Sequence, residues 1–453
     1  MKDARSRGVS HRWKVLGVGV AANASFAAAF SGLPAAAIWI RSDYRIDTGA
    51  LGLVLGMLGL GIVLSELPWG ALTDRWGDRR VLLTGLGSTA AALLAMTLWC
   101  VPVATHVPGT HALEAGFLAI GLLGGSVNGA SGRAVMAWFG PGERGLAMSI
   151  RQTAVPAGAG VGALMLPALA ARGGFAWVYG MLAAMCMLSA ILTMRWVREP
   201  DEPVSGDAAR VRPREVQRAR SPLSSARVWR MVAGIAALCV PQVAVISFAS
   251  VFLHDFGHAG SVAIGAALVA VQLGAACMRI WSGRWTDRHG NRNAYLRACA
   301  LLSVALFALL AAMTMLFAHA SRIAHAFPAP GGEHVVPIVF MALFVLLVSG
   351  GVAASAWHGV AFTELATLAG GGRVGTALAM GNTGAFMAFW ISPSAIPMVL
   401  SASGWPAVWL GASACAALAW PAFAGASRPS DTVRTAVADS HKSKGKTKVE
   451  AAC

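Results

Sequence analysis

The sequence predicts an all-α membrane protein with twelve transmembrane helices, arranged as two related six-helix halves. Three observations carry this prediction: the composition, the length of the apolar runs, and a charged loop that occurs once in each half. Of the 453 residues, 56% are hydrophobic and 12% are charged, whereas about a quarter of the residues in a soluble domain are charged. Such a composition is typical of a chain dissolved in lipid and not of a soluble enzyme.

The apolar runs are long enough to cross a bilayer as helices. A helix of about 18 apolar residues spans a hydrocarbon core of about 30 Å, and it satisfies its own backbone polar groups, as lipid requires. The twelve predicted spans cover approximately residues 15–40, 49–73, 81–103, 112–138, 145–169, 175–197, 229–253, 261–283, 295–317, 335–362, 374–400 and 405–424.

The basic residues indicate the orientation of the chain. Most of the 36 lysines and arginines fall on one side of the twelve-span arrangement, and the positive-inside rule assigns this side to the cytoplasm. We therefore expect a multi-pass protein of the bacterial inner membrane with both termini in the cytoplasm. The net charge of +16 is explained by this topology, with contact to anionic lipid as a secondary interpretation, so no nucleic-acid partner is expected.

Polar segments divide the chain into domains. We expect a cytoplasmic tail over residues 1–14, an N-terminal six-helix bundle over 15–198, a cytoplasmic linker over 199–228, a C-terminal six-helix bundle over 229–425 and a disordered basic tail over 426–453. The linker is rich in Arg, Pro, Ser and Ala, a composition typical of a flexible connection.

Motifs of soluble enzymes do not explain this chain. The seven cysteines have no metal or redox spacing, and no nucleotide-binding loop, zinc spacing or nucleophile elbow is present. We therefore expect no metal, no cofactor and no catalytic residue. Energy for any transport must then come from the gradient of an ion or a solute, and the chain is expected to act as a monomer.

A charged loop occurs twice at equivalent positions. Residues 70–80 read GALTDRWGDRR between the second and third spans, and residues 283–293 read GRWTDRHGNRN between the eighth and ninth spans, at an offset of 213. A weaker repeat pairs residues 147–153, AMSIRQT, with residues 377–383, ALAMGNT, at an offset of 230. Recurrence at matched topological positions indicates an internal duplication.

The loop G-x-x-x-D-R-x-G-x-R-R, its second copy and the six-plus-six layout resemble the major facilitator superfamily of secondary transporters. The resemblance covers about residues 13–425, although the second copy has Asn293 where a second basic residue is usual. It implies two pseudo-symmetric bundles with a solute site near the bilayer midplane, where the halves meet.

The resemblance also implies that the two loops join the bundles on the cytoplasmic side when the outer side is open. Asp74 would face the start of the eleventh span near Arg373, and Asp287 would face the start of the fifth span near Arg144, since an acid is favourable at the positive end of a helix. The alternative is that the loops only determine topology. The candidate gating residues are Asp74, Arg75, Arg79, Asp287, Arg288, Arg292, Glu143, Glu364, Glu66 and Arg279.

Four of these gating candidates lie outside the loops. Glu143 and Glu364 stand at the cytoplasmic ends of the fourth and tenth spans and are expected to pair with loop arginines. Glu66 and Arg279 each precede a loop glycine by four residues. We therefore expect Glu66 and Arg279 to act at the gate, near the membrane surface, and not as solute ligands.

Charged residues inside spans are costly and are the first candidates for solute binding. Arg151 lies about two turns into the fifth span, and a guanidinium can bind a carboxylate through two hydrogen bonds. Few acids compete for it at mid-depth, which favours an anionic or neutral solute. The alternative is a packing arginine bonded to backbone carbonyls. The candidate substrate-binding residues are Arg151, Arg133, Asn23, Asn128, Gln152, Gln242, Trp357, His358 and Asn382.

Two further properties of the solute site can be predicted. Phe26, Phe30 and Phe248, together with Trp357, would form the wall for an aromatic solute, with ordinary packing as the alternative. His358 is the first candidate for carrying a proton because imidazole titrates near neutral pH. Glu66 and Glu364 are the rival proton carriers.

These observations predict a secondary transporter that moves a small anionic or neutral organic solute by alternating access. Proton-coupled uptake is the preferred function, and proton-coupled efflux of a drug or metabolite is the alternative. A membrane sensor that does not transport is the alternative of another class. The expected partners are the solute, protons and the lipid bilayer.

Overall fold

The computed structural model describes residues 2–103, 105–198, 221–257, 259–326, 335–370 and 372–423, and nearly all of them are helical. The first half contains α1 (Lys2–Ala35), α2 (Ala37–Asp43), α3 (Thr48–Trp76), α4 (Asp78–Trp99), α5 (Thr110–Gly124), α6 (Ser126–Trp138), α7 (Arg144–Gln152) and α8 (Ala154–Trp196). The second half contains α10 (Ala226–Val251), α11 (Ser261–His289), α12 (Arg292–Ala326), α13 (Val335–Ser355), α14 (His358–Ala369) and α15 (Val374–Ala422). A 3-10 turn, η2 (Pro222–Ser224), precedes α10, and a π-helix, η3 (Phe252–Phe256), follows it.

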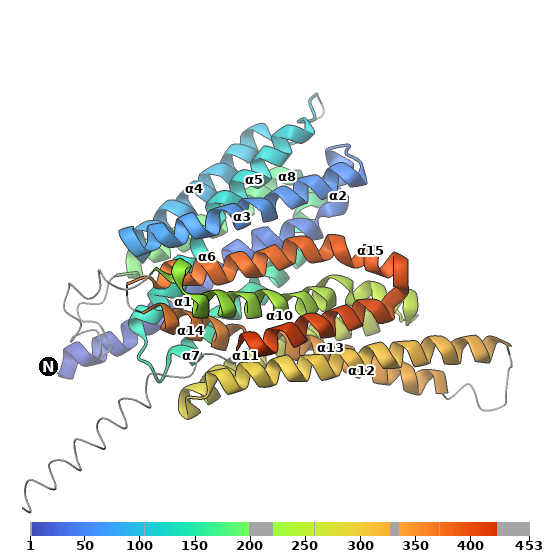
Figure 1. Ribbon diagram of the computed structural model, residues 1–453. Coiled ribbons are helices and arrows are strands. Elements are labelled where there is room, and N and C mark those ends of the chain that lie inside the picture. The colour runs from blue at the N-terminus through green and yellow to red at the C-terminus, as the bar shows by residue number, and fades with distance from the viewer. Residues whose placement is uncertain are drawn as a thin grey trace, which may run out of the picture.

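Ten helical stretches of the described residues are long and apolar enough to cross a membrane. Two of them exceed the length that a bilayer requires: Arg144–Trp196 has 53 residues and Val374–Ala422 has 49. Each contains one glycine with positive φ, Gly174 at 68° and Gly404 at 77°, a conformation that glycine adopts without steric cost. The helix reverses at this glycine, as Figure 1 shows for α15. The described residues therefore make twelve passes, and the predicted all-α membrane fold is confirmed.

The structure describes the expected N-terminal tail, linker and C-terminal tail to different extents. α1 begins at Lys2, so the first span continues without a break into the segment that was expected to be a tail. Most of the expected linker, residues 199–220, and the expected basic tail over 426–453 lie outside the described residues.

Three of the predicted spans are interrupted by a short break. In the fourth span α5 ends at Gly124 and α6 begins at Ser126, and in the tenth span α13 ends at Ser355 and α14 begins at His358. In the fifth span α7 ends at Gln152. Irregular backbone at membrane depth is tolerated where protein surrounds it, so these breaks belong to the interior of the bundle.

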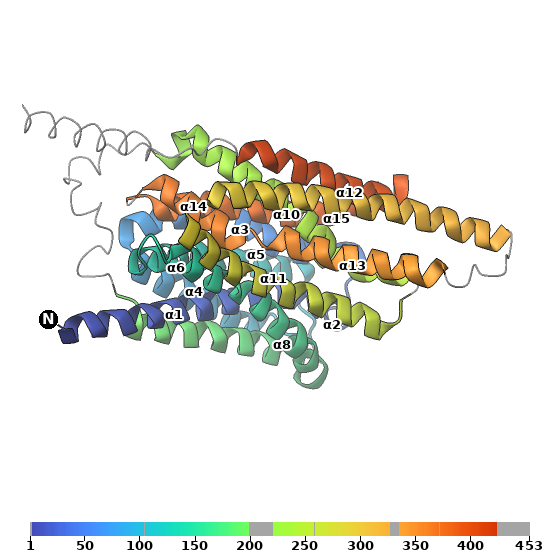
Figure 2. The same ribbon diagram turned by 90° about the horizontal axis from the view of Figure 1, so that it is seen from below.

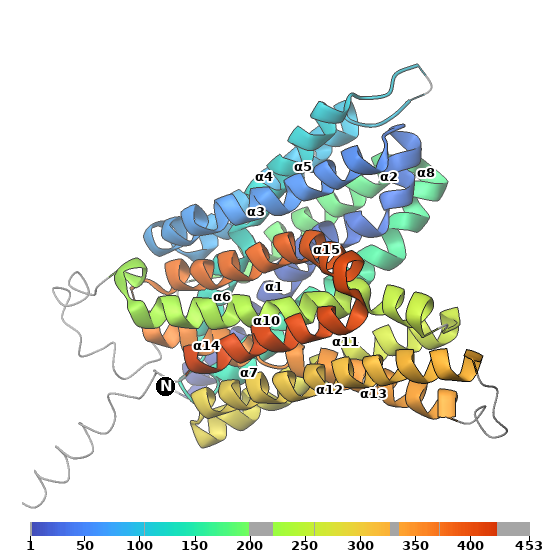
Figure 3. The ribbon, with the colours of Figure 1, turned by 45° about the vertical axis from the view of Figure 1, so that its right-hand side comes forward.

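The two halves meet along a seam to which both contribute helices. Figures 1 and 3 show α3, α4 and α5 along one edge of the bundle and α12 and α13 along the opposite edge, with α15 between them. Across the seam α3 and α6 pack against α15, and α7 packs against α11 and α14. Figure 2 shows α1 and α8 side by side within the first half.

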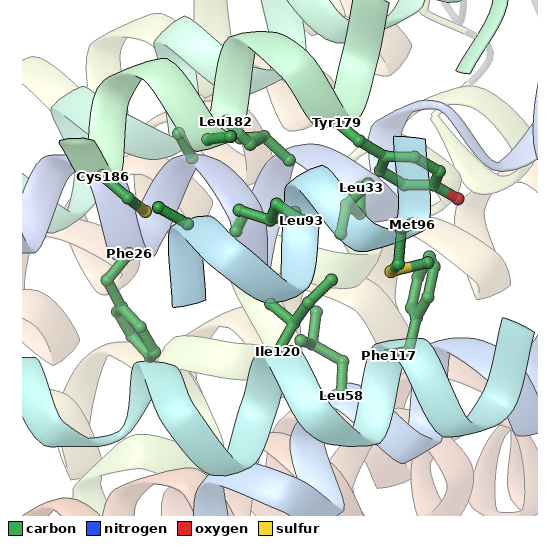
Figure 4. Packing of buried hydrophobic residues seen from close by; sticks show 14 of the residues in the cluster. Phe26, Leu33, Leu58, Leu93, Met96, Phe117, Ile120, Tyr179, Leu182 and Cys186 are labelled. Atoms are coloured by element: carbon green, nitrogen blue, oxygen red, sulfur yellow. The ribbon is translucent and has the colours of Figure 1, made fainter. Parts of the chain in front are cut away.

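Each half has its own apolar core. Figure 4 shows Leu93 and Met96 of α4, Phe117 and Ile120 of α5 and Tyr179 of α8 packed together in the first half, and all five are at most 5% exposed. Lipid tails are as apolar as these side chains, so close packing and dispersion contacts, more than exclusion from water, stabilise the bundle. The buried charged side chains of Glu66 and Arg279, by contrast, hydrogen-bond across the seam.

Candidate functional site

Asp74, at the end of α3, contacts the start of α15 in the other half. Its carboxylate accepts hydrogen bonds from the backbone N–H groups of Gly375 (2.8 Å) and Thr376 (2.8 Å) and from the Thr376 hydroxyl (2.6 Å). These N–H groups have no partner within the helix, and the helix dipole favours an anion there. The approach is close because Gly375 has no side chain: a Cβ atom would lie 2.8 Å from the Gly70 carbonyl oxygen.

Asp287 repeats this arrangement at the start of α7. It accepts hydrogen bonds from the N–H groups of Gly145 (3.0 Å) and Leu146 (2.8 Å), and a Cβ atom on Gly145 would lie 2.8 Å from the Gly283 carbonyl oxygen. Asp74 and Asp287 therefore lie where the repeated loop led us to expect them, and both contacts join the two halves. We call the end of the bundle that carries them the motif end.

The other loop residues have more varied surroundings. Arg292 donates to Asp287 (3.0 Å) and lies 3.8 Å from Glu364, as expected for a loop arginine and its partner. Arg79 donates to the carbonyl oxygen of Met194 in its own half (2.9 Å). Arg75 and Arg288 are exposed.

Glu143 departs from the expectation, because its partner is Arg12 and not a loop arginine. The two side chains form two hydrogen bonds of 2.5 and 3.2 Å. The partner comes from α1, which extends beyond the expected span and lies beside the loop between α6 and α7. Both partners belong to the first half, so this ion pair does not join the halves.

Arg133 was predicted to bind solute, but it lies with the acids of the motif end. Its Nη1 donates to Asp78 (2.7 Å), and its Nε lies 3.7 Å from Asp74. Opposite charges at these distances neutralise one another, so Arg133 supports the Asp74 contact and is a poor solute ligand. Asp78 was not among the predicted site residues.

Glu66 was expected to act at the gate, and it is fully buried in the seam. Asn128 of α6 donates to one carboxylate oxygen (2.6 Å), and Asn382 of α15 donates to the other (3.4 Å). The carboxylate is thus bonded by one amide from each half. We call Glu66, Asn128 and Asn382 the Glu66 group.

Arg151 lies next to this group and is 3% exposed. Its guanidinium donates to the Asn128 carbonyl oxygen (2.5 Å) and to the Ser131 hydroxyl (2.8 and 3.0 Å). When the Asn23 amide is turned to satisfy its neighbours, its oxygen also accepts from Arg151 at 2.8 and 2.9 Å. All these partners are neutral. Ser131 was missed, since a serine inside a span has no distinctive sequence signal.

Arg279 is the centre of a second buried group. It donates to the backbone carbonyl oxygens of Ser355 (2.8 Å) and Gln152 (2.9 Å), and its Nη2 lies 3.4 Å from Nδ1 of His358. Gln152 belongs to the first half and the other members to the second half. We call Arg279, His358 and Gln152 the Arg279 group.

The two groups occupy equivalent positions of the duplicated chain. Glu66 and Arg279 are separated by 213 residues, and Asn128 and His358, like Gln152 and Asn382, are separated by 230. The same offsets relate the repeated sequences. The duplication therefore places an acidic side chain, Glu66, on one side of the seam and a basic side chain, Arg279, on the other.

The remaining predicted residues have separate environments. Trp357 is fully buried, donates its indole N–H to the Ala354 carbonyl oxygen (2.7 Å) and stacks on His358 at 3.8 Å, so it packs within its own half. Gln242 is 4% exposed, and its Oε1 has no hydrogen-bond partner among the described residues.

Two of the aromatic residues expected to line the solute site lie together, but they contact aromatic residues that were not predicted. Phe26 and Phe30 of α1 meet Phe386 of α15 edge to face at 5.7 and 5.2 Å, and Phe30 also meets Phe389 at 6.4 Å. Phe248 packs instead in the core of the second half. A cavity with room for about one water molecule lies beside Phe26 and Phe30 and is lined mainly by apolar side chains.

The polar seam could bind an organic ion but has no arrangement suited to a metal. Among the described residues, no three His, Cys, Asp or Glu side chains lie together as a metal site would require. The polar groups at the seam are guanidinium, carboxylate, imidazole, amide and hydroxyl groups. Such groups bind through hydrogen bonds and charge.

Comparisons with known proteins agree with this architecture. A family model described as the Major Facilitator Superfamily (MFS) matches residues 18–327. The uncharacterized MFS-type transporter Rv2994 of Mycobacterium tuberculosis is 33% identical over 309 residues, which are 68% of this chain and 66% of that protein. The match therefore spans just under two thirds of the relative.

Solved structures share the fold at low sequence identity. The proton:xylose symporter XylE superposes with a TM-score of 0.67 at 14% identity, over 91% of this chain and 95% of that chain. The human organic anion transporter MFSD10 superposes with a TM-score of 0.64 at 18% identity, over 91% and 99% of the two chains.

Proposed function

Because this chain belongs to the Major Facilitator Superfamily, we propose that it is a secondary transporter that takes up a small organic anion together with protons. Residues 15–198 rock against residues 229–425, and the solute reaches the seam from one side of the membrane at a time. The chain acts as a monomer in this proposal.

The buried guanidinium of Arg151 is the observation that carries the proposed anionic substrate. Its partners are neutral oxygen and sulfur atoms, and no carboxylate of the described residues forms an ion pair with it. Glu66 shares Asn128 with Arg151 but does not bond the guanidinium itself. A carboxylate solute would bond the guanidinium directly, through two charge-assisted hydrogen bonds.

The proposed orientation follows from charge. The basic segments next to the motif end favour the cytoplasm of a bacterial cell, with the chain in the inner membrane and both termini inside. The Asp74 and Asp287 contacts then close the cytoplasmic side, and the anion enters from the periplasm. Opening the motif end breaks both contacts and releases the anion into the cell.

The proposal is tested with purified full-length protein in two steps. A thermal-shift screen of monocarboxylates, beginning with lactate and benzoate, selects the probe. Uptake of that probe into proteoliposomes under an inward proton gradient is then measured. Arg151→Ala should reduce uptake at least about 10-fold, because the loss of one charge-assisted hydrogen bond costs about 1.5–3 kcal/mol.

Two further variants make this test specific. Arg151→Lys retains the charge but not the two-pronged geometry and should give an intermediate rate. Arg172→Ala removes an exposed arginine and should match the wild type. Full uptake by Arg151→Ala, or a screen in which no monocarboxylate binds the wild type, would contradict an anion site at Arg151.

Proton-coupled efflux remains the alternative because one fold can serve both directions. Direction is measured in vesicles of known orientation, where accumulation on the side of the motif end supports uptake and depletion supports efflux. A chain that moves no solute in either direction would favour the membrane sensor.

A further inference from the structure

Glu66 and Arg151 are bonded to the same residue through different atoms. The Asn128 side chain donates to Glu66 (2.6 Å), while the Asn128 backbone carbonyl accepts from Arg151 (2.5 Å). Glu66 and Arg151 form no direct ion pair within the described residues. Their charges are therefore near one another without a direct ion pair between them.

The surroundings of Glu66 contain few other charges. α15 and α1, from Val15 to Ala35, contribute no ionisable Asp, Glu, His, Lys or Arg side chain, and α6 contributes Arg133, which is bound to Asp78 and Asp74. The charged residues of the other helices packed on α3 lie near their ends: Asp78, Arg79 and Arg80 on α4, His111 and Glu114 on α5, and Arg41 and Asp43 on α2. Arg151 of α7 is the cation that shares a partner with Glu66.

The electrostatics of a buried site restrict its net charge. With Glu66 ionised, Arg151 and Glu66 sum to zero. A monoanion bound at Arg151 would leave one uncompensated negative charge in a low-dielectric interior, which is costly. A proton on Glu66 would restore neutrality.

We infer that Glu66 is the proton-binding group of the transport cycle, and that one proton bound at Glu66 compensates one negative charge bound at Arg151. A monoanion then enters with one proton. The proton adds to a carboxylate oxygen of Glu66 from the outer water and leaves to the inner water after the anion dissociates. This inference rests on the proposed function and identifies its coupling residue and its charge stoichiometry.

The alternative proton carriers are less suited to this role. His358 lies 3.4 Å from the Arg279 guanidinium, so a proton on its ring would place two positive charges together. Glu364 lies at the motif end, 3.8 Å from Arg292, and is not bonded to the Arg151 environment. Glu66 combines burial, neutral partners from both halves and a shared residue with Arg151.

The test uses full-length protein in proteoliposomes with the monocarboxylate selected above as probe and a pH-sensitive dye inside. In the wild type, probe influx should acidify the interior, and an imposed membrane potential should not change the rate. Glu66→Gln should exchange probe across the membrane at a near-normal rate but lose accumulation under a proton gradient at least 10-fold. Glu114→Gln, an acid-to-amide change at an ion pair with His111, is the matched control and should behave as the wild type.

Proton-driven accumulation by Glu66→Gln, or wild-type transport that responds to membrane potential, would overturn the inference. Loss of both exchange and accumulation in Glu66→Gln, with probe binding retained, would also overturn it, because the carboxylate would then be needed for motion and not for coupling. Failure of the proposed function appears in a different variant: Arg151→Ala would then bind and transport the probe normally.

Discussion

The Glu66 group and the Arg279 group occupy equivalent sites on the two sides of the seam, yet they hold their central charge by different means. Glu66 is bonded by the side-chain amides of Asn128 and Asn382, which can rotate away. Arg279 is bonded by the backbone carbonyl oxygens of Ser355 and Gln152, which are fixed by the helices that end there. The duplicated scaffold thus contains one adjustable centre and one rigid centre.

This difference indicates a division of roles. The carbonyl oxygens at the breaks of the fifth and tenth spans have lost helical partners, and a buried unpaired carbonyl is costly. Arg279 satisfies two of them and so holds the seam together. The Asp74 and Asp287 contacts, by contrast, have remained alike, since both hold the same end of the bundle closed.

The largest expected effect is on stability, from Arg279→Ala. Removing the guanidinium leaves the Gln152 carbonyl oxygen without this donor and leaves the Ser355 carbonyl oxygen with the His358 ring nitrogen, 3.3 Å away. An unpaired buried carbonyl costs about 1–3 kcal/mol, so we expect a loss of about 2 kcal/mol in the free energy of unfolding, measured by denaturant titration in detergent.

Glu66→Gln is the matched comparison for this measurement. The new amide keeps an acceptor towards one asparagine and presents a donor to the other, whose own amide can turn to accept it, so the cost should stay below about 1 kcal/mol. Equal losses in the two variants would contradict the distinction between a rigid and an adjustable centre.

An intermediate effect is expected on turnover, from Asp74→Asn and Asp287→Asn. A neutral amide loses the charge interaction with the helix terminus, about 1 kcal/mol, which corresponds to roughly a 5-fold change in the population closed at the motif end. Asp74 accepts three hydrogen bonds from the other half and Asp287 two, so Asp74→Asn should be the more severe.

Transport kinetics separate this effect from binding. Both variants should change the maximal rate and leave the concentration for half-maximal uptake nearly unchanged. Asp255→Asn, at an exposed acid paired with His254, should be silent. A change confined to affinity would mean that these acids belong to the solute site.

The smallest effect is expected from Glu143→Gln. Its ion pair with Arg12 is partly exposed, with side chains 48% and 22% accessible, and such pairs contribute about 0.2–1 kcal/mol. Both residues lie in one half, so transport should be unaffected. A marked fall in turnover would instead support the prediction that Glu143 is a gating residue.

The fold and the two loop contacts could be predicted because they depend on local and repeated signals. Apolar run length defined the spans, and the recurring glycine and aspartate placed Asp74 and Asp287 opposite helix starts. The breaks at Gly125 and Trp357 were not predicted, since hydropathy continues through them.

Contacts between distant helices account for the surroundings that differ from the expectation. Arg133 lies inside an apolar span, and only the rotation of α6 about its axis turns its side chain towards Asp78. Glu66 precedes the loop by about one turn, and only the packing of α3 against α15 brings it to Asn382. Neither rotation nor packing can be read from a single sequence.

The most direct test of the central claim is the equilibrium affinity of the purified protein for the selected monocarboxylate, measured for the wild type and for Arg151→Ala. An anion held by the buried guanidinium predicts at least about a 10-fold weaker affinity in the variant, with Arg172→Ala unchanged. Equal affinity in the wild type and Arg151→Ala would contradict the account.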